Sequence, residues 1–126
     1  MKRIILDTNA LLAITQFKLD IFSTLERQID DKYALFVLDK IQKELEKLIK
    51  ESRLSEKKAA KLALALITHK NVQVIKTPEN GLTVDEELLR MKGYAVLTQD
   101  AELKRQLKEQ GIEVLTIRQK KKISQA

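Results

Sequence analysis

Short apolar runs alternate along this chain with longer segments in which apolar residues recur every three or four positions. The apolar runs, which are rich in β-branched residues, predict five strands at residues 2–6, 33–38, 71–75, 94–98 and 112–117. The first run continues as Ile4-Ile5-Leu6 without polar alternation, which is typical of a strand covered on both faces. We therefore expect this strand to lie inside a sheet.

The segments between these strands predict helices, because their apolar positions have helical spacing and residues that cap helices precede them. The expected helices cover residues 10–14, 18–29, 83–91 and 101–110, a stretch after Asp39 and a stretch that Ser55 caps. Asp39 with Gln42, and Thr83 with Glu86, have the spacing of a capping box. Asp100 is expected to cap the helix that follows it.

Strands that alternate with helices indicate an α/β fold of three layers, in which a central parallel sheet of about five strands has helices on both faces. The length of 126 residues matches one domain. We expect this domain to cover residues 1–118 and a basic C-terminal tail to follow at residues 119–126. Such sheets bind ligands beyond the carboxyl ends of their strands, near the point where the strand order reverses.

Composition narrows the chemistry that the chain can perform. The absence of cysteine excludes disulfide bonds, thiolate metal sites and cysteine nucleophiles, and the single histidine, His69, excludes a histidine acid–base pair. The apolar runs are far shorter than a membrane span and the first residues lack the pattern of a signal peptide, so we expect a cytoplasmic protein with no membrane partner. Catalysis would depend mainly on carboxylates, hydroxyls, amides and lysines.

The formal net charge of +6 is unevenly distributed along the chain. Residues 40–70 contain nine basic and four acidic residues, and residues 101–126 contain seven basic and three acidic residues. Acidic residues outnumber basic ones in residues 1–39 and 71–100. A basic surface around an acidic centre suits a metal-dependent enzyme that acts on a polyanion, although lysine-rich surfaces also occur without such a role.

Four acidic residues occupy positions from which they can reach one edge of the predicted sheet. Asp7 directly follows the first strand, and Asp100 follows the fourth. Glu44 lies in the second turn of the helix after the second strand, and Asp85 lies in the first turn of the helix before the fourth. Carboxylates that lie close together raise one another's pKa or require a cation. Mg²⁺ or Mn²⁺ would suit them, since both prefer oxygen ligands and can clamp a phosphoryl group.

The same acids have plainer interpretations that the spacing leaves open. Asp7 and Asp100 can simply cap helices. Asp85 can complement a helix dipole, and Glu44 can form surface ion pairs with the lysines around it.

Four segments, taken together, resemble the motifs of PIN-domain nucleases. In chain order they are Ile4-Ile5-Leu6-Asp7-Thr8-Asn9, Ile41-x-x-Glu44-Leu45, Val84-Asp85-Glu86-Glu87-Leu88-Leu89 and Val96-Leu97-Thr98-Gln99-Asp100-x-Glu102-Leu103. The resemblance covers nearly the whole chain, residues 3–118, and the motifs occur in the family's order. Two further segments, residues 17–22 and 111–114, are similar to archaeal PIN proteins related to eukaryotic ribosomal-RNA processing factors.

The resemblance implies strand order 3-2-1-4-5 and a divalent-metal-dependent endoribonuclease. It implies that the catalytic and metal-binding residues, which would hold Mg²⁺ or Mn²⁺, are Asp7, Glu44, Asp85 and Asp100. Asn9 and Thr98 would hold these acids in place, and Glu102 would add an outer contact. Within the third motif, Glu86 stays open as a substitute for Asp85.

The expected partner is RNA, cleaved to leave 5′-phosphate and 3′-hydroxyl ends as in related enzymes. The basic helices of residues 40–70 and the tail lysines Lys120, Lys121 and Lys122 would bind its backbone electrostatically. Aromatic residues make up only 4% of the chain, so base stacking would be weak. The helices of residues 10–29 offer an apolar surface through which the chain could form a homodimer.

Two other functions stay open. One is an RNA-binding ribosome-assembly factor with little or no catalysis, although the presence of all four acids argues against it. The other is the ribonuclease toxin of a toxin–antitoxin pair, which a neighbouring gene for a small DNA-binding protein would favour. A phosphotransfer receiver domain fits less well, because it normally has an acidic pair after its first strand, and here a single acid and an amide stand there. An aspartate-nucleophile phosphatase also fits less well, because Asn9 stands where it would need a second aspartate.

Overall fold

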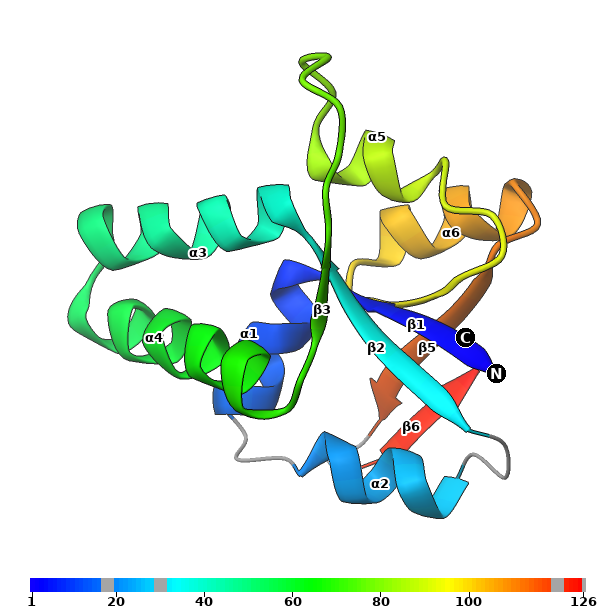
Figure 1. Cartoon of the computed structure of the whole chain (residues 1–126), viewed down its shortest axis with the longest axis horizontal. Coiled ribbons are helices and arrows are strands. Elements are labelled where there is room, and N and C mark those ends of the chain that lie inside the picture. The colour runs from blue at the N-terminus through cyan, green and yellow to red at the C-terminus, as the bar shows by residue number, and fades with distance from the viewer. Residues whose placement is uncertain (17–19, 29–31, 119–121, 126) are drawn as a thin grey trace.

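The chain forms a six-stranded sheet with helices packed against it, as Figure 1 shows. The computed structural model describes residues 1–16, 20–28, 32–118 and 122–125. In chain order the elements are β1 (Lys2–Leu6), α1 (Thr8–Gln16), α2 (Ile21–Gln28), β2 (Tyr33–Leu38), α3 (Asp39–Glu51), α4 (Leu54–His69), β3 (Gln73–Ile75), α5 (Val84–Leu88), β4 (Ala95–Leu97), α6 (Ala101–Glu109), β5 (Glu113–Arg118) and β6 (Lys122–Gln125). No helix in the described part of the chain combines the length and apolar character that crossing a membrane requires.

The strand order is β3-β2-β1-β4-β5-β6, with β1 to β5 parallel and β6 antiparallel to β5. For the first five strands this confirms the order that the resemblance implied. The chain moves from β1 outward to β2 and β3, and then returns to the other side of β1 to form β4 and β5. Right-handed crossovers in opposite directions place their helices on opposite faces. Accordingly, α1, α3 and α4 lie on one side of the sheet and α5 and α6 on the other (Figure 1).

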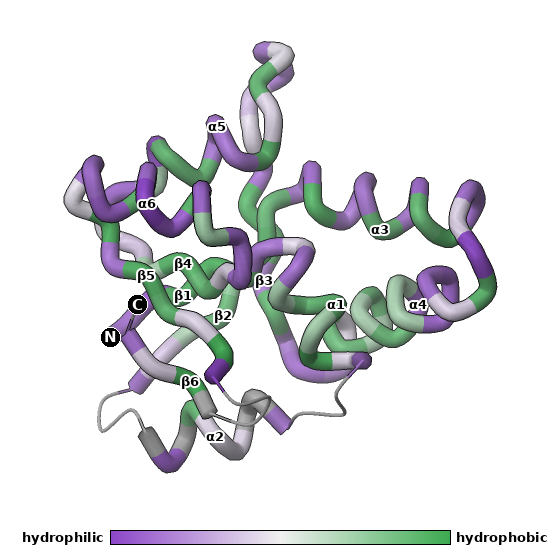
Figure 2. Tube along the Cα trace, turned by 180° about the vertical axis from the view of Figure 1, so that it is seen from behind, coloured by the Kyte–Doolittle hydropathy of each residue, from purple (hydrophilic) through white to green (hydrophobic). Residues whose placement is uncertain are grey.

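Aliphatic side chains of the central strands form the core. Ile4, Ile5 and Leu6 of β1 are fully buried, which agrees with the unbroken apolar run in the sequence. From α3, Ile41 and Leu45 pack into the same core. Figure 2 shows the hydrophobic strands at the centre and the hydrophilic turns of the helices outside.

Two of the four predicted helix caps are correct. The capping box at Thr83 and the cap at Asp100 are both present. The cap predictions at Asp39 and Ser55 are wrong, because α3 and α4 begin without a side-chain cap. Asp39 instead accepts hydrogen bonds from the backbone N–H and the hydroxyl of Thr77, at 3.2 and 2.6 Å, which tie the start of α3 to the segment after β3.

The end of the chain differs from the expected tail. Residues 119–121 and 126 lie outside the described residues, but Lys122–Gln125 form β6 and pair with β5. Ile123 lies opposite Ile117, and both side chains are buried. The prediction of a tail is therefore wrong for residues 122–125, which form a strand. The sequence did not indicate this strand, because one apolar residue next to a run of lysines is too weak a pattern.

Replacement of Ile123 by alanine tests whether β6 belongs to the folded domain. Core truncations of isoleucine cost about 2–5 kcal/mol, and an edge strand belongs at the lower end, so we expect urea denaturation to show a loss of about 2 kcal/mol. Gln125→Ala is the matched control, because Gln125 is exposed on the same strand and should change stability by less than about 0.5 kcal/mol. Equal, negligible effects of both substitutions would show that β6 adds nothing to the core.

Candidate functional site

Four acidic side chains from four separate segments line one hollow at the carboxyl edge of the sheet. The hollow has a volume of about 220 Å³ and is lined by Asp7, Thr8, Asn9, Leu12, Glu44, Val84, Asp85 and Asp100. Asp7 and Asp100 follow β1 and β4, the strands between which the order reverses, where open parallel sheets bind ligands. The structure thus brings together the four acids named from the sequence, and no lysine or arginine is among the described lining residues.

Asp7 directly follows β1 and is only 5% exposed. Its Oδ1 accepts a hydrogen bond from the backbone N–H of Thr8 at 2.8 Å, and its Oδ2 accepts one from the hydroxyl of Thr98, also at 2.8 Å. The same hydroxyl oxygen accepts a hydrogen bond from the backbone N–H of Asp100 at 3.2 Å. One threonine hydroxyl therefore links the acids that follow two adjacent strands.

Asn9 and Gln99 fix the segment that leads from β4 to Asp100. Asn9 Oδ1 accepts the backbone N–H of Gln99 at 2.9 Å. The side-chain amide of Gln99 pairs with both backbone groups of Ile117, accepting its N–H at 2.7 Å and donating to its carbonyl at 3.1 Å. This amide continues the pairing of β4 with β5 beyond the end of β4. The residue before Asp100 is consequently bound to α1 through its backbone and to β5 through its side chain.

Glu44 approaches the hollow from the second turn of α3. Its Oε2 accepts a hydrogen bond from the hydroxyl of Thr8 at 2.8 Å. Because Thr8 follows Asp7 in the chain, this bond holds the acid of α3 close to the acid of β1. Helix α3 begins at the carboxyl end of β2, so its first turns lie at this edge of the sheet.

The three consecutive acids of the third motif have three different environments. Asp85 lines the hollow. Glu86 completes the capping box, accepting the backbone N–H of Thr83 at 3.0 Å. Glu87 is buried and forms an ion pair with Lys40 at 3.3 Å. Of the two candidates left open by the sequence, the structure therefore places Asp85, and not Glu86, at the hollow.

The electrostatics of the hollow disfavour the ionised forms of Asp7 and Asp85. Burial raises the pKa of the Asp7 carboxyl, and the negative charges of Asp85 and Glu44 raise it further, against the two hydrogen bonds that this carboxylate accepts. Burial also raises the pKa of Asp85, to which the charge of Asp100 adds. A cation bound in the hollow would offset the increase in both of these pKa values.

The donor atoms fit a hard divalent cation. Carboxylate oxygens are the ligands that Mg²⁺ and Mn²⁺ prefer. Within the described ranges, no three carboxylate or imidazole side chains are arranged to hold an ion by themselves. Mg²⁺ does not require such a cage, because it usually retains several waters and binds one or two carboxylates together with substrate phosphates. The acids of the hollow therefore suit an ion whose remaining ligands are water and substrate oxygens.

None of the remaining predicted site residues is among the described residues that line the hollow. Glu102 is exposed on α6 and pairs with Arg105, one turn further along, so the structure does not bring it to the hollow as an outer contact. Lys120 and Lys121 lie outside the described residues, and Lys122 is the first residue of β6. A role of these lysines in RNA binding stays a prediction.

Three contributing residues were not predicted as charge partners or tethers of the site: Thr8, Gln99 and Lys40. The bonds of Thr8 and Gln99 join positions far apart in the chain, and no local signal indicates them. A signal for Lys40 does exist. Glu87 lies three residues after the buried Val84, on the inner face of a short helix, and a buried carboxylate requires a partner.

Comparison with known proteins identifies relatives of this chain. Residues 4–120 match the model of a family described as a PIN like domain. The chain is 34% identical over 125 residues to Ribonuclease VapC4 of Methanocaldococcus jannaschii, covering 96% of this chain and 94% of that protein. It is 31% identical over 119 residues to Ribonuclease VapC9 of Archaeoglobus fulgidus, covering 94% of this chain and 85% of that protein.

A solved structure shares the fold. The PIN domain endonuclease Utp24 superposes with a TM-score of 0.79 and 25% sequence identity, over 98% of this chain and 90% of that one. The strand order β3-β2-β1-β4-β5 agrees with this shared fold. The chain belongs to the PIN-like domain family, the family of nucleases that its sequence resembles.

Proposed function

We propose that this protein is a divalent-metal-dependent endoribonuclease. The observation that carries the proposal is one hollow in which Asp7, Glu44, Asp85 and Asp100 gather with no basic side chain among the described lining residues. Mutually repelling carboxylates do not stabilise a fold, whereas a bound cation and a polyanionic substrate account for them. The relatives named ribonucleases and the structurally similar endonuclease support RNA as the substrate class.

The proposed reaction is hydrolysis of an RNA phosphodiester. Water adds to phosphorus, the bond to the 3′ oxygen breaks and that oxygen takes up a proton, which leaves 5′-phosphate and 3′-hydroxyl ends. Mg²⁺ or Mn²⁺ held by carboxylates of this hollow, with water and substrate phosphate as its other ligands, would offset phosphate charge and act as a Lewis acid. The chain itself supplies preorganisation, since Thr98 holds Asp7 and Thr8 holds Glu44 before any ligand binds.

The same chemistry serves either biological role indicated by the resemblance. Processing of ribosomal RNA is the role we propose first, and the toxin of a toxin–antitoxin pair is the alternative. A neighbouring gene for a small DNA-binding protein would favour the toxin. The expected homodimer and the cytoplasmic location stay predictions.

Replacement of Asp7 by asparagine should abolish cleavage. Loss of an outer-shell partner alone costs about 10–100-fold in metal sites, so loss of a ligand should cost more than about 100-fold in Mn²⁺-dependent cleavage of a fluorescent RNA. The fold should persist, because Asn9 Oδ1 lies 3.3 Å from the Thr98 hydroxyl and can accept its hydrogen bond instead. Full activity of Asp7→Asn would refute the assignment. A wild-type protein that binds RNA but shows neither Mn²⁺-dependent cleavage nor Mn²⁺-dependent stabilisation would be a binding factor.

The metal-free stability should depend on pH through Asp7. Its folded-state pKa is raised, so the protonated carboxyl favours folding below the ordinary pKa and this contribution is lost as pH rises through the raised value. Asp7→Asn removes the ionised form, and the difference between the two proteins isolates this group. In chelator at neutral pH the variant should melt at or above the temperature of the wild type, with the gap closing in acid. A variant that is clearly less stable at neutral pH would contradict the pKa direction.

Thr98→Val tests whether a hydroxyl positions two of the acids. Valine has the same shape but leaves Asp7 Oδ2 and the backbone N–H of Asp100 without their partner. We expect a loss of about 1–3 kcal/mol in stability and of about 10–100-fold in Mn²⁺ affinity and cleavage. Thr98→Ser, which keeps the hydroxyl, is the control and should restore most of both. Equal behaviour of valine and serine would show that the hydroxyl is dispensable.

A further inference from the structure

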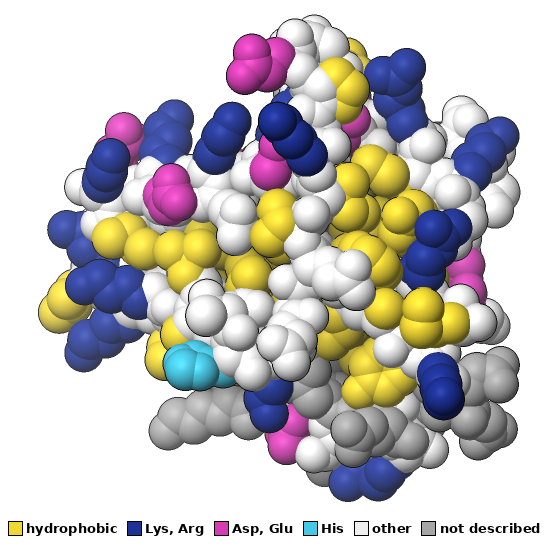
Figure 3. Space-filling view, in the orientation of Figure 1, with side chains coloured by type: hydrophobic (Ala, Val, Ile, Leu, Met, Phe, Trp, Pro, Cys, Tyr) yellow, Lys and Arg dark blue, Asp and Glu magenta, His cyan; other side chains and the backbone are white. Residues whose placement is uncertain are grey.

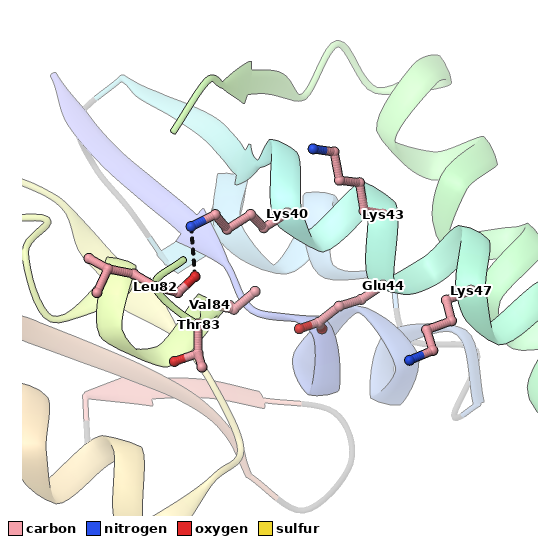
Figure 4. Close-up of a pocket in the computed structure, with 7 residues that line it drawn as sticks. All are labelled: Lys40, Lys43, Glu44, Lys47, Leu82, Thr83 and Val84. Carbon is pink, nitrogen blue, oxygen red and sulfur yellow. Dashed lines mark hydrogen bonds between the residues drawn. The ribbon is translucent and has the colours of Figure 1, made fainter. Parts of the chain in front are cut away.

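A second hollow adjoins the acidic one, between α3 and the segment before α5. It has a volume of about 350 Å³ and is lined by Lys40, Lys43, Glu44, Lys47, Leu82, Thr83 and Val84 (Figure 4). It shares Glu44 and Val84 with the acidic hollow. A third hollow, of about 230 Å³, lies at the loop of residues 76–82 and shares Lys40, Lys43 and Leu82 with the second. The second and third hollows together form a trough, here called the α3 trough, that leads into the acidic hollow.

The α3 trough presents lysines beside its acids Asp39, Glu44 and Glu79, whereas no lysine or arginine is among the described residues that line the acidic hollow. Lys43 and Lys47 are exposed on consecutive turns of α3 and extend to opposite sides of it in Figure 4, with Glu44 between them. In the part of the chain that the structure describes, neither lysine forms an ion pair. Lys76 lines the far end of the trough. Figure 3 shows lysine and arginine side chains gathered along the outer side of α3.

The walls of the α3 trough are tied to each other. Lys40 Nζ donates a hydrogen bond to the carbonyl of Leu82 at 2.7 Å, drawn in Figure 4, and one to Asn80 Oδ1 at 3.3 Å. The same ammonium pairs with the buried Glu87. Lys40 is thus a structural cation that fixes the projecting loop of Figure 1 against α3. A ligand entering the trough would not have to order this wall.

We propose that the α3 trough binds single-stranded RNA on one side of the bond to be cut, with Lys43 and Lys47 contacting its phosphates. The inference rests on the proposed nuclease function and names the surface that presents the substrate. From Lys40 to Lys47 helix α3 advances about 10 Å, which is long enough for a short stretch of one strand to lie along it. No aromatic residue is among the described residues that line the trough. Binding should therefore depend on phosphate charge and show little base preference.

The test compares two double variants in the Asp7→Asn background, where the RNA stays intact. Lys43→Gln/Lys47→Gln removes the trough charges. Lys58→Gln/Lys61→Gln removes the same charge from exposed positions of α4, which belongs to the basic stretch of residues 40–70 but contributes no described residue to the lining of the trough. Binding of a short fluorescent single-stranded RNA is measured by anisotropy over a range of salt concentrations. The trough variant should lower the slope of log K against log salt by about 1.4, since each phosphate contact to a single strand contributes about 0.7. The α4 variant should keep the slope and Kd of the Asp7→Asn parent protein.

Activity assays in the otherwise unchanged protein provide a second readout. The trough variant should raise KM for single-stranded RNA and leave kcat within about twofold, because uniform substrate binding is what it removes. An unchanged slope and Kd in the trough variant, equal weakening by the α4 variant, or equally lysine-dependent binding of a duplex of the same sequence would each overturn the proposal. Failure of the nuclease function is a separate result: wild-type protein would then cut no RNA, whatever the lysines do to binding.

Discussion

The buried carboxylate of Asp7 is the constraint on which the site depends. A carboxylate with 5% exposure, directly after the three buried residues that end β1, must be matched by nearby donors. The backbone of α1 provides one, and the hydroxyl of Thr98 on the neighbouring segment provides the other. Because that hydroxyl also accepts the backbone N–H of Asp100, satisfying one acid positions a second. The first and fourth motifs are thereby joined at the point where the strand order reverses.

The site also separates two kinds of lysine on one helix. Lys40 stabilises the fold, since it forms an ion pair with buried Glu87 and donates a hydrogen bond to the carbonyl of Leu82. Lys43 and Lys47 flank Glu44 at the surface without ion pairs among the described residues. A single helix thus carries an acid toward the proposed metal site and cations toward the proposed substrate path. The raised pKa of Asp7 indicates that gathering the acids in the hollow costs the metal-free protein some stability.

Much of the architecture follows from local patterns in the sequence. The buried run of β1, the capping box at Thr83 and the cap at Asp100 are read within a few residues, and each has a physical signature that does not depend on distant contacts. Patterns of this kind failed where a distant partner outweighed the local preference. Asp39 binds Thr77 instead of capping α3, and Ile123 pairs with β5 although lysines precede it.

The sequence by itself determined which residue types were available and where they stood relative to strand ends: acids after β1 and β4, an acid in the second turn of α3, and no cysteine or histidine pair. Only the tertiary structure decided which acids meet. In the folded chain Asp85 lines the hollow, whereas its neighbours Glu86 and Glu87 bind elsewhere, and Gln99 forms hydrogen bonds with Ile117. The physical reason is that a short helix points its successive side chains in different directions, and only packing against the rest of the chain determines what each one meets.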